Sequence, residues 1–180
     1  MSQYQERLRQ FDVCMHITMA QEGGYDKTAN VAANWAGGSV RRGSLRGSYR
    51  RIRAADFPMT DIENLHPLTV GLVYYDIWDE LYGHSLGVKF LACVFDAAVV
   101  VGLETAIRWL HLALDLPEAR VMSKEIKEIL HQLPCDLKPC ARFQALRYKH
   151  LTESGNSAED SLERIAWVGM AAAKAEEEWI

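Results

Sequence analysis

The sequence predicts a mainly α-helical globular protein, and three observations lead to that prediction. Apolar residues recur at helical spacing over most of the 180-residue chain. A hydrophobic fraction of 49% and a charged fraction of 24% are typical of folded rather than disordered chains. Helical spacing is lost only over residues 26–57, which predicts one long irregular segment that can include a short β-hairpin. The length suits one domain, so we predict a single domain over residues 1–180.

The helices are predicted from apolar spacing and from residues that start or stop helices. The first helix carries an apolar stripe and is expected to end at the glycine pair Gly23-Gly24. Thr69 is expected to cap a second helix that runs towards Leu81. Residues 88–101 are apolar on almost every side, which is typical of a buried central helix. The stripe of the first helix consists of Leu8, Phe11, Met15, Ile17 and Met19.

Four further helices are expected in the C-terminal half. Residues 103–114 follow Gly102 and place apolar side chains on one face. Ser123 is expected to cap a helix over residues 124–133, and another helix is expected over residues 139–151. Ser157 opens the last helix, which is amphipathic and extends to the C-terminus.

Charge and hydropathy restrict the location and partners of the chain. The net charge of −4 disfavours nucleic acid as a partner. The first nine residues are polar, unlike a secretory signal. The longest apolar run, residues 88–102, contains Lys89 and Asp96 and is too short to cross a bilayer. We therefore expect no membrane span and synthesis in the cytoplasm without a signal peptide.

The chain contains four cysteines, which we expect to be reduced thiols. Cys14 and Cys93 fall within apolar helical spacing and are interpreted as buried small side chains. Cys135 and Cys140, with His131 nearby, loosely resemble zinc ligands, but neighbouring prolines favour an ordinary turn between helices. We expect neither a metal site nor a cofactor.

The irregular segment carries six arginines in an otherwise acidic chain. They can form a patch that meets an anion, such as the acidic face of a protein partner, or they can be solvated and paired with local acids. Exposed ion pairs contribute only about 0 to 1 kcal/mol each, so stability alone does not explain the cluster. The arginines are Arg41, Arg42, Arg46, Arg50, Arg51 and Arg53, and the local acids are Asp56, Asp61 and Glu63.

Residues 22–25, Glu-Gly-Gly-Tyr, carry the candidate chemistry. Glu22 follows an apolar helix, where partial desolvation favours the protonated form of a carboxyl group. Cleavage of a glycosidic bond needs such a protonated acid near neutral pH. The alternative is an ordinary helix end with a solvated acid.

The order of motifs along residues 8–150 resembles glycoside hydrolase family 108, the N-acetylmuramidases found as phage endolysins and secretion activators. The resemblance implies a lysozyme-like helical fold with a catalytic part over about residues 1–102 and a helical part resembling a peptidoglycan-binding region over about residues 103–180. It also implies hydrolysis of the bond between N-acetylmuramic acid and N-acetylglucosamine in peptidoglycan glycan strands, at the cell wall or in the periplasm after release. The motifs are Glu22-Gly23-Gly24-Tyr25, Gly37-Gly38 with Gly43, Leu68-Thr69, Tyr74-Tyr75-Asp76-Ile77-Trp78, Phe95-Asp96-Ala97-Ala98 with Gly102, Ala106-Ile107, Leu110-His111-Leu112-Ala113-Leu114, and Arg142 with Tyr148.

Carried over to this chain, the resemblance makes Glu22 the general acid that protonates the leaving oxygen. Tyr25 would line the entrance or pack as an ordinary aromatic residue, and Trp35 and Ser39 would contact the sugar.

Three further residues have a structural alternative. Tyr74 and Trp78 can stack on sugar faces, but their helical spacing favours the core. Asp96 lies in the most apolar segment, so we interpret it as a structural group that requires a buried partner.

Several polar residues of the family pattern are absent. Val40 stands where the family has threonine, and Val100 stands where it has asparagine. These substitutions motivate an alternative function, in which a catalytically weakened or inactive lysozyme-like module binds within a phage or secretion assembly through its arginines.

Overall fold

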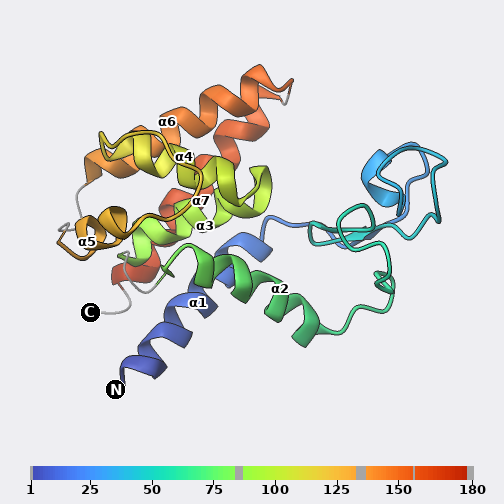
Figure 1. Ribbon diagram of the computed structural model, residues 1–180, viewed down its shortest axis with the longest axis horizontal. Helices are drawn as coiled ribbons and strands as arrows, with labels where there is room; N and C mark the ends of the chain where they lie inside the picture. Colours follow the sequence, from blue (N-terminus) through green and yellow to red (C-terminus); the bar gives the residue numbers. More distant parts are fainter. Residues whose placement is uncertain (1, 84–86, 133–136, 156, 178–180) are drawn as a thin grey trace. The chain divides into compact units, whose positions relative to one another are not determined.

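The computed structural model describes residues 2–83, 87–132, 137–155 and 157–177, and over these residues the chain is mainly helical, as predicted (Figure 1). None of the helices in these ranges is long and apolar enough to cross a membrane. The elements in chain order are α1 (Gln3–Met19), β1 (Tyr25–Asp26), the 3-10 helix η1 (Ala32–Asn34), β2 (Ser48–Tyr49), β3 (Ile52–Arg53), α2 (Pro67–Glu80), α3 (Val88–Val101), α4 (Leu103–Ala113), α5 (Lys124–Gln132), α6 (Leu137–Glu153) and α7 (Ala158–Glu177).

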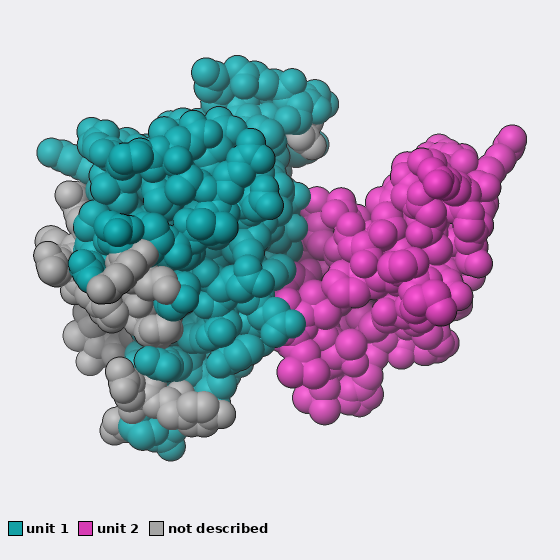
Figure 2. All heavy atoms as spheres, viewed as in Figure 1, with its two compact units in different colours: residues 1–18, 75–180 teal, residues 19–74 magenta. Residues whose placement is uncertain are grey.

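The chain forms two compact units (Figure 2). Unit 1 comprises residues 1–18 and 75–180, and unit 2 comprises residues 19–74. Unit 1 therefore contains most of the helices, and unit 2 contains the β-strands and the arginine-rich segment. The single domain and the boundary near residue 102 stay predictions.

The core of unit 1 is built around α3, which packs against α4, α6 and α7 (Figure 1). Every residue from Leu91 to Ala98 is buried, which confirms the prediction of a central helix. Phe11 of α1 also makes edge-on ring contacts with Trp78 of α2 and with Phe95 of α3. Each large apolar side chain buried in this way contributes about 1.5 to 3 kcal/mol to folding.

The structure contains some of the predicted helix caps and lacks one of them. Ser123 caps α5 as predicted, because its hydroxyl oxygen accepts a hydrogen bond from the backbone N–H group of Ile126 at 3.2 Å. Ser157, which was predicted to open the last helix, caps α7 by accepting from the N–H group of Asp160 at 3.3 Å. The prediction for Thr69 is wrong. Helix α2 begins two residues earlier at Pro67, whose fixed φ suits the first helical position.

The N–H group of Leu68 donates to Nδ1 of His66 at 3.2 Å, so His66 is the cap of α2, which the sequence pattern did not reveal. The end of α1 and the start of α6 also differ from the prediction. Helix α1 ends at Met19, before the glycines, because the N–H group of Glu22 folds back onto the Met19 carbonyl at 3.2 Å. Helix α6 begins at Leu137, since a proline at position 139 is tolerated within the first turn of a helix.

Unit 2 contains a three-stranded antiparallel sheet in the order β1-β2-β3. Tyr49 pairs with both Tyr25 and Ile52, so only two residues connect β2 to β3. This hairpin confirms the prediction that the irregular segment can include one. The two connecting residues, Arg50 and Arg51, have φ values of 48° and 65°. A two-residue turn with both φ values positive normally carries asparagine or glycine.

Gly47 is required where β2 approaches β1. Its φ is 82°, and a Cβ atom there would lie 2.4 Å from the Asp26 carbonyl oxygen and 2.7 Å from the Tyr25 ring. We expect Gly47→Ala to destabilise unit 2 by about 2 to 4 kcal/mol, measured by denaturant unfolding. Gly38→Ala is the matched control, because Gly38 has a φ of 70° but a Cβ atom there would make only an ordinary contact with the Ala55 Cβ at 3.9 Å. An equal effect of both substitutions would contradict the close approach.

Candidate active site

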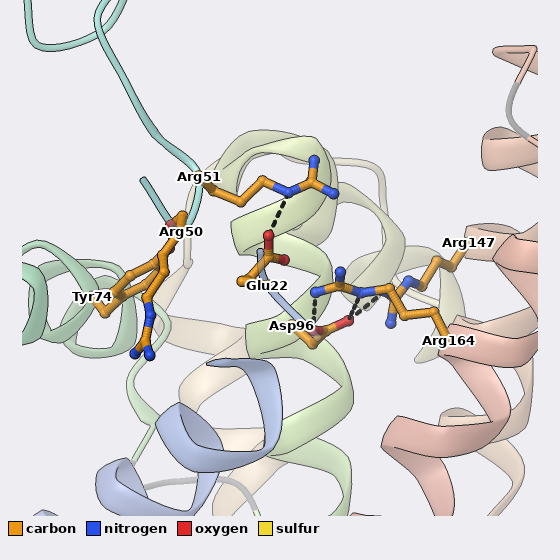
Figure 3. A network of polar contacts seen from close by, with 7 residues as sticks. All are labelled: Glu22, Arg50, Arg51, Tyr74, Asp96, Arg147 and Arg164. Atoms are coloured by element: carbon orange, nitrogen blue, oxygen red, sulfur yellow. Dashed lines mark hydrogen bonds and ion pairs between the residues drawn. The ribbon is translucent and has the colours of Figure 1, made fainter. Parts of the chain in front are cut away.

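Glu22 lies in the turn between α1 and β1, and its side chain is only 5% exposed. The guanidinium Nε of Arg51 donates to Glu22 Oε2 at 2.9 Å (Figure 3). The side chain is therefore largely shielded from solvent, as its position beyond an apolar helix predicted. The arginine partner is a finding that the sequence analysis missed.

The turn that carries Arg51 holds a strained backbone. A non-glycine residue in the left-handed region costs roughly 1 to 2 kcal/mol, and the turn contains two in succession. The Tyr74 hydroxyl donates a hydrogen bond to the Arg50 carbonyl and fixes the turn (Figure 3). The strained geometry thus directs Arg51 towards Glu22.

The ion pair determines what Glu22 can do. A general acid must reach the leaving oxygen of its substrate, whereas the Glu22 carboxylate is occupied by Arg51. Arg51 is 42% exposed, so part of its side chain faces solvent. The site is therefore a shielded carboxylate paired with a partly exposed cation.

Of the other residues of unit 2 that were predicted to contact substrate, Tyr25 and Trp35 have structural roles of their own. The Tyr25 hydroxyl donates to the Arg46 carbonyl at 3.1 Å, and its ring packs against Gly47. The Trp35 indole N–H donates to the Ala29 carbonyl at 2.8 Å. Ser39 is exposed. Their contact with a sugar stays a prediction.

Tyr74 and Trp78 are 2% and 1% exposed, respectively. Trp78 lies in an aromatic cluster with Phe11 and Tyr75. In this conformation neither ring face is accessible to a ligand. This agrees with the alternative in which both side chains belong to the core.

Asp96 has the buried partners that the sequence analysis required. Its carboxylate contacts the guanidinium group of Arg147, and both side chains are fully buried (Figure 3). Arg164 donates through Nη2 to Oδ1 at 2.6 Å and through Nε to Oδ2 at 3.1 Å. Burial alone would raise the pKa of Asp96, but the charge of Arg147 and the hydrogen bonds and charge of Arg164 outweigh it and lower that pKa. Asp96 therefore links α3 to α6 and α7 as a structural ion cluster.

The six arginines of unit 2 do not act as one group. Arg53 pairs with Asp56 at 2.6 Å, as the local-acid interpretation predicts. Glu63 instead pairs with Lys27 at 3.3 Å. Arg41 and Arg42 are exposed.

Two cavities lie within the described part of unit 1. One, of about 500 Å³, lies among α3, α6 and α7, and the other, of about 480 Å³, is lined by the end of α2 and the start of α4. Glu22 lines neither of these two cavities. Among the described residues, no group of three or more His, Cys, Asp or Glu side chains could hold a metal ion.

The chain was compared with known proteins. No family model matches it, and no curated protein matches it. Among solved structures it is similar to the structure of Brucella abortus SagA, with a TM-score of 0.74 and 14% sequence identity over 91% of this chain and 94% of that chain. At this identity the similarity establishes the fold: the chain has the same fold as SagA.

Proposed function

We propose that the chain is a peptidoglycan hydrolase that cleaves the bond between N-acetylmuramic acid and N-acetylglucosamine. The observation that carries the proposal is the shielded Glu22 side chain in the turn between α1 and β1, which is 5% exposed and paired with the partly exposed Arg51. The motif order along the chain and the fold shared with SagA support it. The protein would act at the cell wall or in the periplasm after release.

In this proposal Glu22 protonates the glycosidic oxygen that leaves, so Arg51 must first release the carboxylate. Opening an ion pair with one buried partner costs about 1 to 3 kcal/mol. A carboxylate of the wall peptides can accept the guanidinium group in its place, because arginine binds carboxylates through paired hydrogen bonds. Substrate binding would then both free Glu22 and exclude water from it.

Arg51→Gln is expected to raise kcat about tenfold on soluble glycan strands that lack peptides, because these strands offer Arg51 no peptide carboxylate in exchange and the variant has no ion pair to open. The rate of reducing-end release at saturating substrate measures this change. Arg50→Gln is the matched control, since Arg50 lies in the same turn and contacts the Tyr49 ring rather than Glu22. A lower kcat for Arg51→Gln than for the control would contradict the proposed release step.

A second candidate function is a non-catalytic module that binds the wall or an acidic protein. The Glu22–Arg51 ion pair favours it, because a carboxylate held by a guanidinium group is not available to a glycosidic oxygen. Val40 and Val100, which replace polar residues of the family pattern, point in the same direction. Exposed Arg41 and Arg42 would then provide the contact surface.

One experiment separates the two candidates. Purified walls are incubated with the wild-type chain and with Glu22→Gln, and both the loss of turbidity and the protein that sediments with the walls are recorded. Clearing by the wild-type chain alone supports the hydrolase. Salt-sensitive sedimentation of both proteins without any clearing supports the binding module and excludes the hydrolase.

A further inference from the structure

Two cysteines of unit 1 face each other across a helix contact. Cys93 on α3 and Cys140 on α6 are both free thiols, and their sulfur atoms are 3.9 Å apart. The residues are distant in the sequence, and α3 packs directly against α6. Side-chain rotation has to shorten the sulfur separation to the roughly 2.05 Å of a disulfide bond.

The two thiols differ in access to solvent. Cys93 is fully buried, whereas Cys140 is partly exposed. Both line the cavity of about 500 Å³ among α3, α6 and α7, together with Lys89 and Gln144. A small reactant that enters the cavity therefore meets Cys140 first.

The thiols also differ in their tendency to ionise. The hydrogen bond with Cys93 and the charge of Lys89 lower the pKa of Cys140, although partial burial opposes them. The hydrogen bond with Cys140 and then burial raise the pKa of Cys93. Because the thiolate is the nucleophile in thiol chemistry, Cys140 is the attacking group of the pair.

We propose that Cys93 and Cys140 form a redox-active dithiol, which small disulfides convert into an internal disulfide bond between α3 and α6. The Cys140 thiolate attacks one sulfur of oxidised glutathione, forms a mixed disulfide and expels one glutathione thiolate. The Cys93 thiol then attacks the Cys140 sulfur, and its proton passes to the second glutathione, which leaves as a thiol. Two protein thiols are oxidised and one molecule of oxidised glutathione is reduced to two thiols.

The stability of unit 1 would therefore depend on whether its compartment is reducing or oxidising. The disulfide restricts the unfolded chain between positions 93 and 140, which stabilises the folded state. Reducing compartments keep the dithiol open, and oxidising compartments close it. This inference is independent of the proposed hydrolase activity.

The test treats the reduced full-length chain with oxidised glutathione and maps its peptides without reduction. We expect a peptide pair that joins Cys93 to Cys140, together with a rise in Tm of about 4 to 16 °C that dithiothreitol reverses. Cys135→Ser should give the same linked pair. A disulfide that involves Cys135, or unlinked thiols after prolonged oxidation, would overturn the proposal.

Two variants test the order of attack. Cys93→Ala should accumulate glutathione on Cys140, because the thiol that resolves the mixed disulfide is missing. Cys140→Ala should leave Cys93 unmodified. Cys14, which is fully buried and whose pKa is raised by burial, is an internal control that should stay unmodified throughout. Modification of Cys93 in the Cys140→Ala chain would contradict the assigned roles.

Discussion

Asp96→Asn is expected to destabilise unit 1 by about 3 to 5 kcal/mol and to lower its Tm by about 6 to 20 °C. Asp96 is fully buried and neutralises two arginines, of which Arg147 is also fully buried. Within the part of the chain that the structure describes, Nε and Nη1 of Arg147 have no hydrogen-bond partner, and Nη2 bonds Asp96. The substitution would therefore leave a buried guanidinium charge without compensation. Calorimetry or fluorescence-detected unfolding measures the loss.

Asp115→Asn provides the matched control. Asp115 also pairs with an arginine, Arg142, but its side chain is 77% exposed and the pair is solvated. We expect a change within about 1 kcal/mol. A similar small change for Asp96→Asn would contradict the structural role of the buried cluster.

The contribution of Asp96 also depends on pH. Its pKa is lower in the folded chain than in the unfolded chain, so its stabilising effect is present above the unfolded value of about 4 and is lost as the pH falls through the folded value. The difference in stability between the wild-type chain and Asp96→Asn should therefore shrink in acid. Unfolding curves at neutral pH and below pH 4 check this sign.

Glu22→Gln is expected to lower the rate of wall hydrolysis by about 10² to 10⁴, the usual contribution of a general acid. Glutamine keeps the shape of the side chain and can still accept a hydrogen bond from Arg51, so the fold should be retained, but it has no proton to give. Glu63→Gln is the control, because Glu63 is 57% exposed and pairs with Lys27. A rate for Glu22→Gln within twofold of the control would remove Glu22 from the mechanism.

The helical framework was predictable because its signals are local. Apolar residues on all sides of residues 88–101 predicted a buried helix, and α3 occupies that segment with its middle fully buried. The Ser123 and Ser157 caps were equally predictable, since a hydroxyl group at the cap position bonds a backbone N–H three residues ahead. The cap at His66 was missed because imidazole is not a common capping group and Thr69 offered a more familiar one.

The candidate site was predictable only in part, because its partners are distant in the sequence. The position of Glu22 beyond an apolar helix indicated desolvation, and the side chain is indeed 5% exposed. Arg51 lies 29 positions further along, and only the hairpin turn with two positive φ values brings it to Glu22. No periodicity reveals such a turn when arginines replace the usual asparagine and glycine. The run of arginines was a signal, but it did not identify which of them has a specific partner.

The contacts of Asp96 illustrate the same limit. An acid inside an apolar helix predicts a buried partner, because an unpaired charge there would be prohibitively costly. The sequence does not say which of the chain's arginines provides it. Arg147 and Arg164 become its partners only when α6 and α7 pack against α3.

The central claim is that Glu22 donates a proton to a glycosidic bond of peptidoglycan. Analysis of the reaction products tests this claim most directly. Purified peptidoglycan is digested with the wild-type chain and with Glu22→Gln, the new ends are reduced with borohydride, and the fragments are identified by mass spectrometry. We expect new reducing ends on N-acetylmuramic acid with the wild-type chain and none with Glu22→Gln. Equal products from both proteins, or no new ends from either, would contradict it.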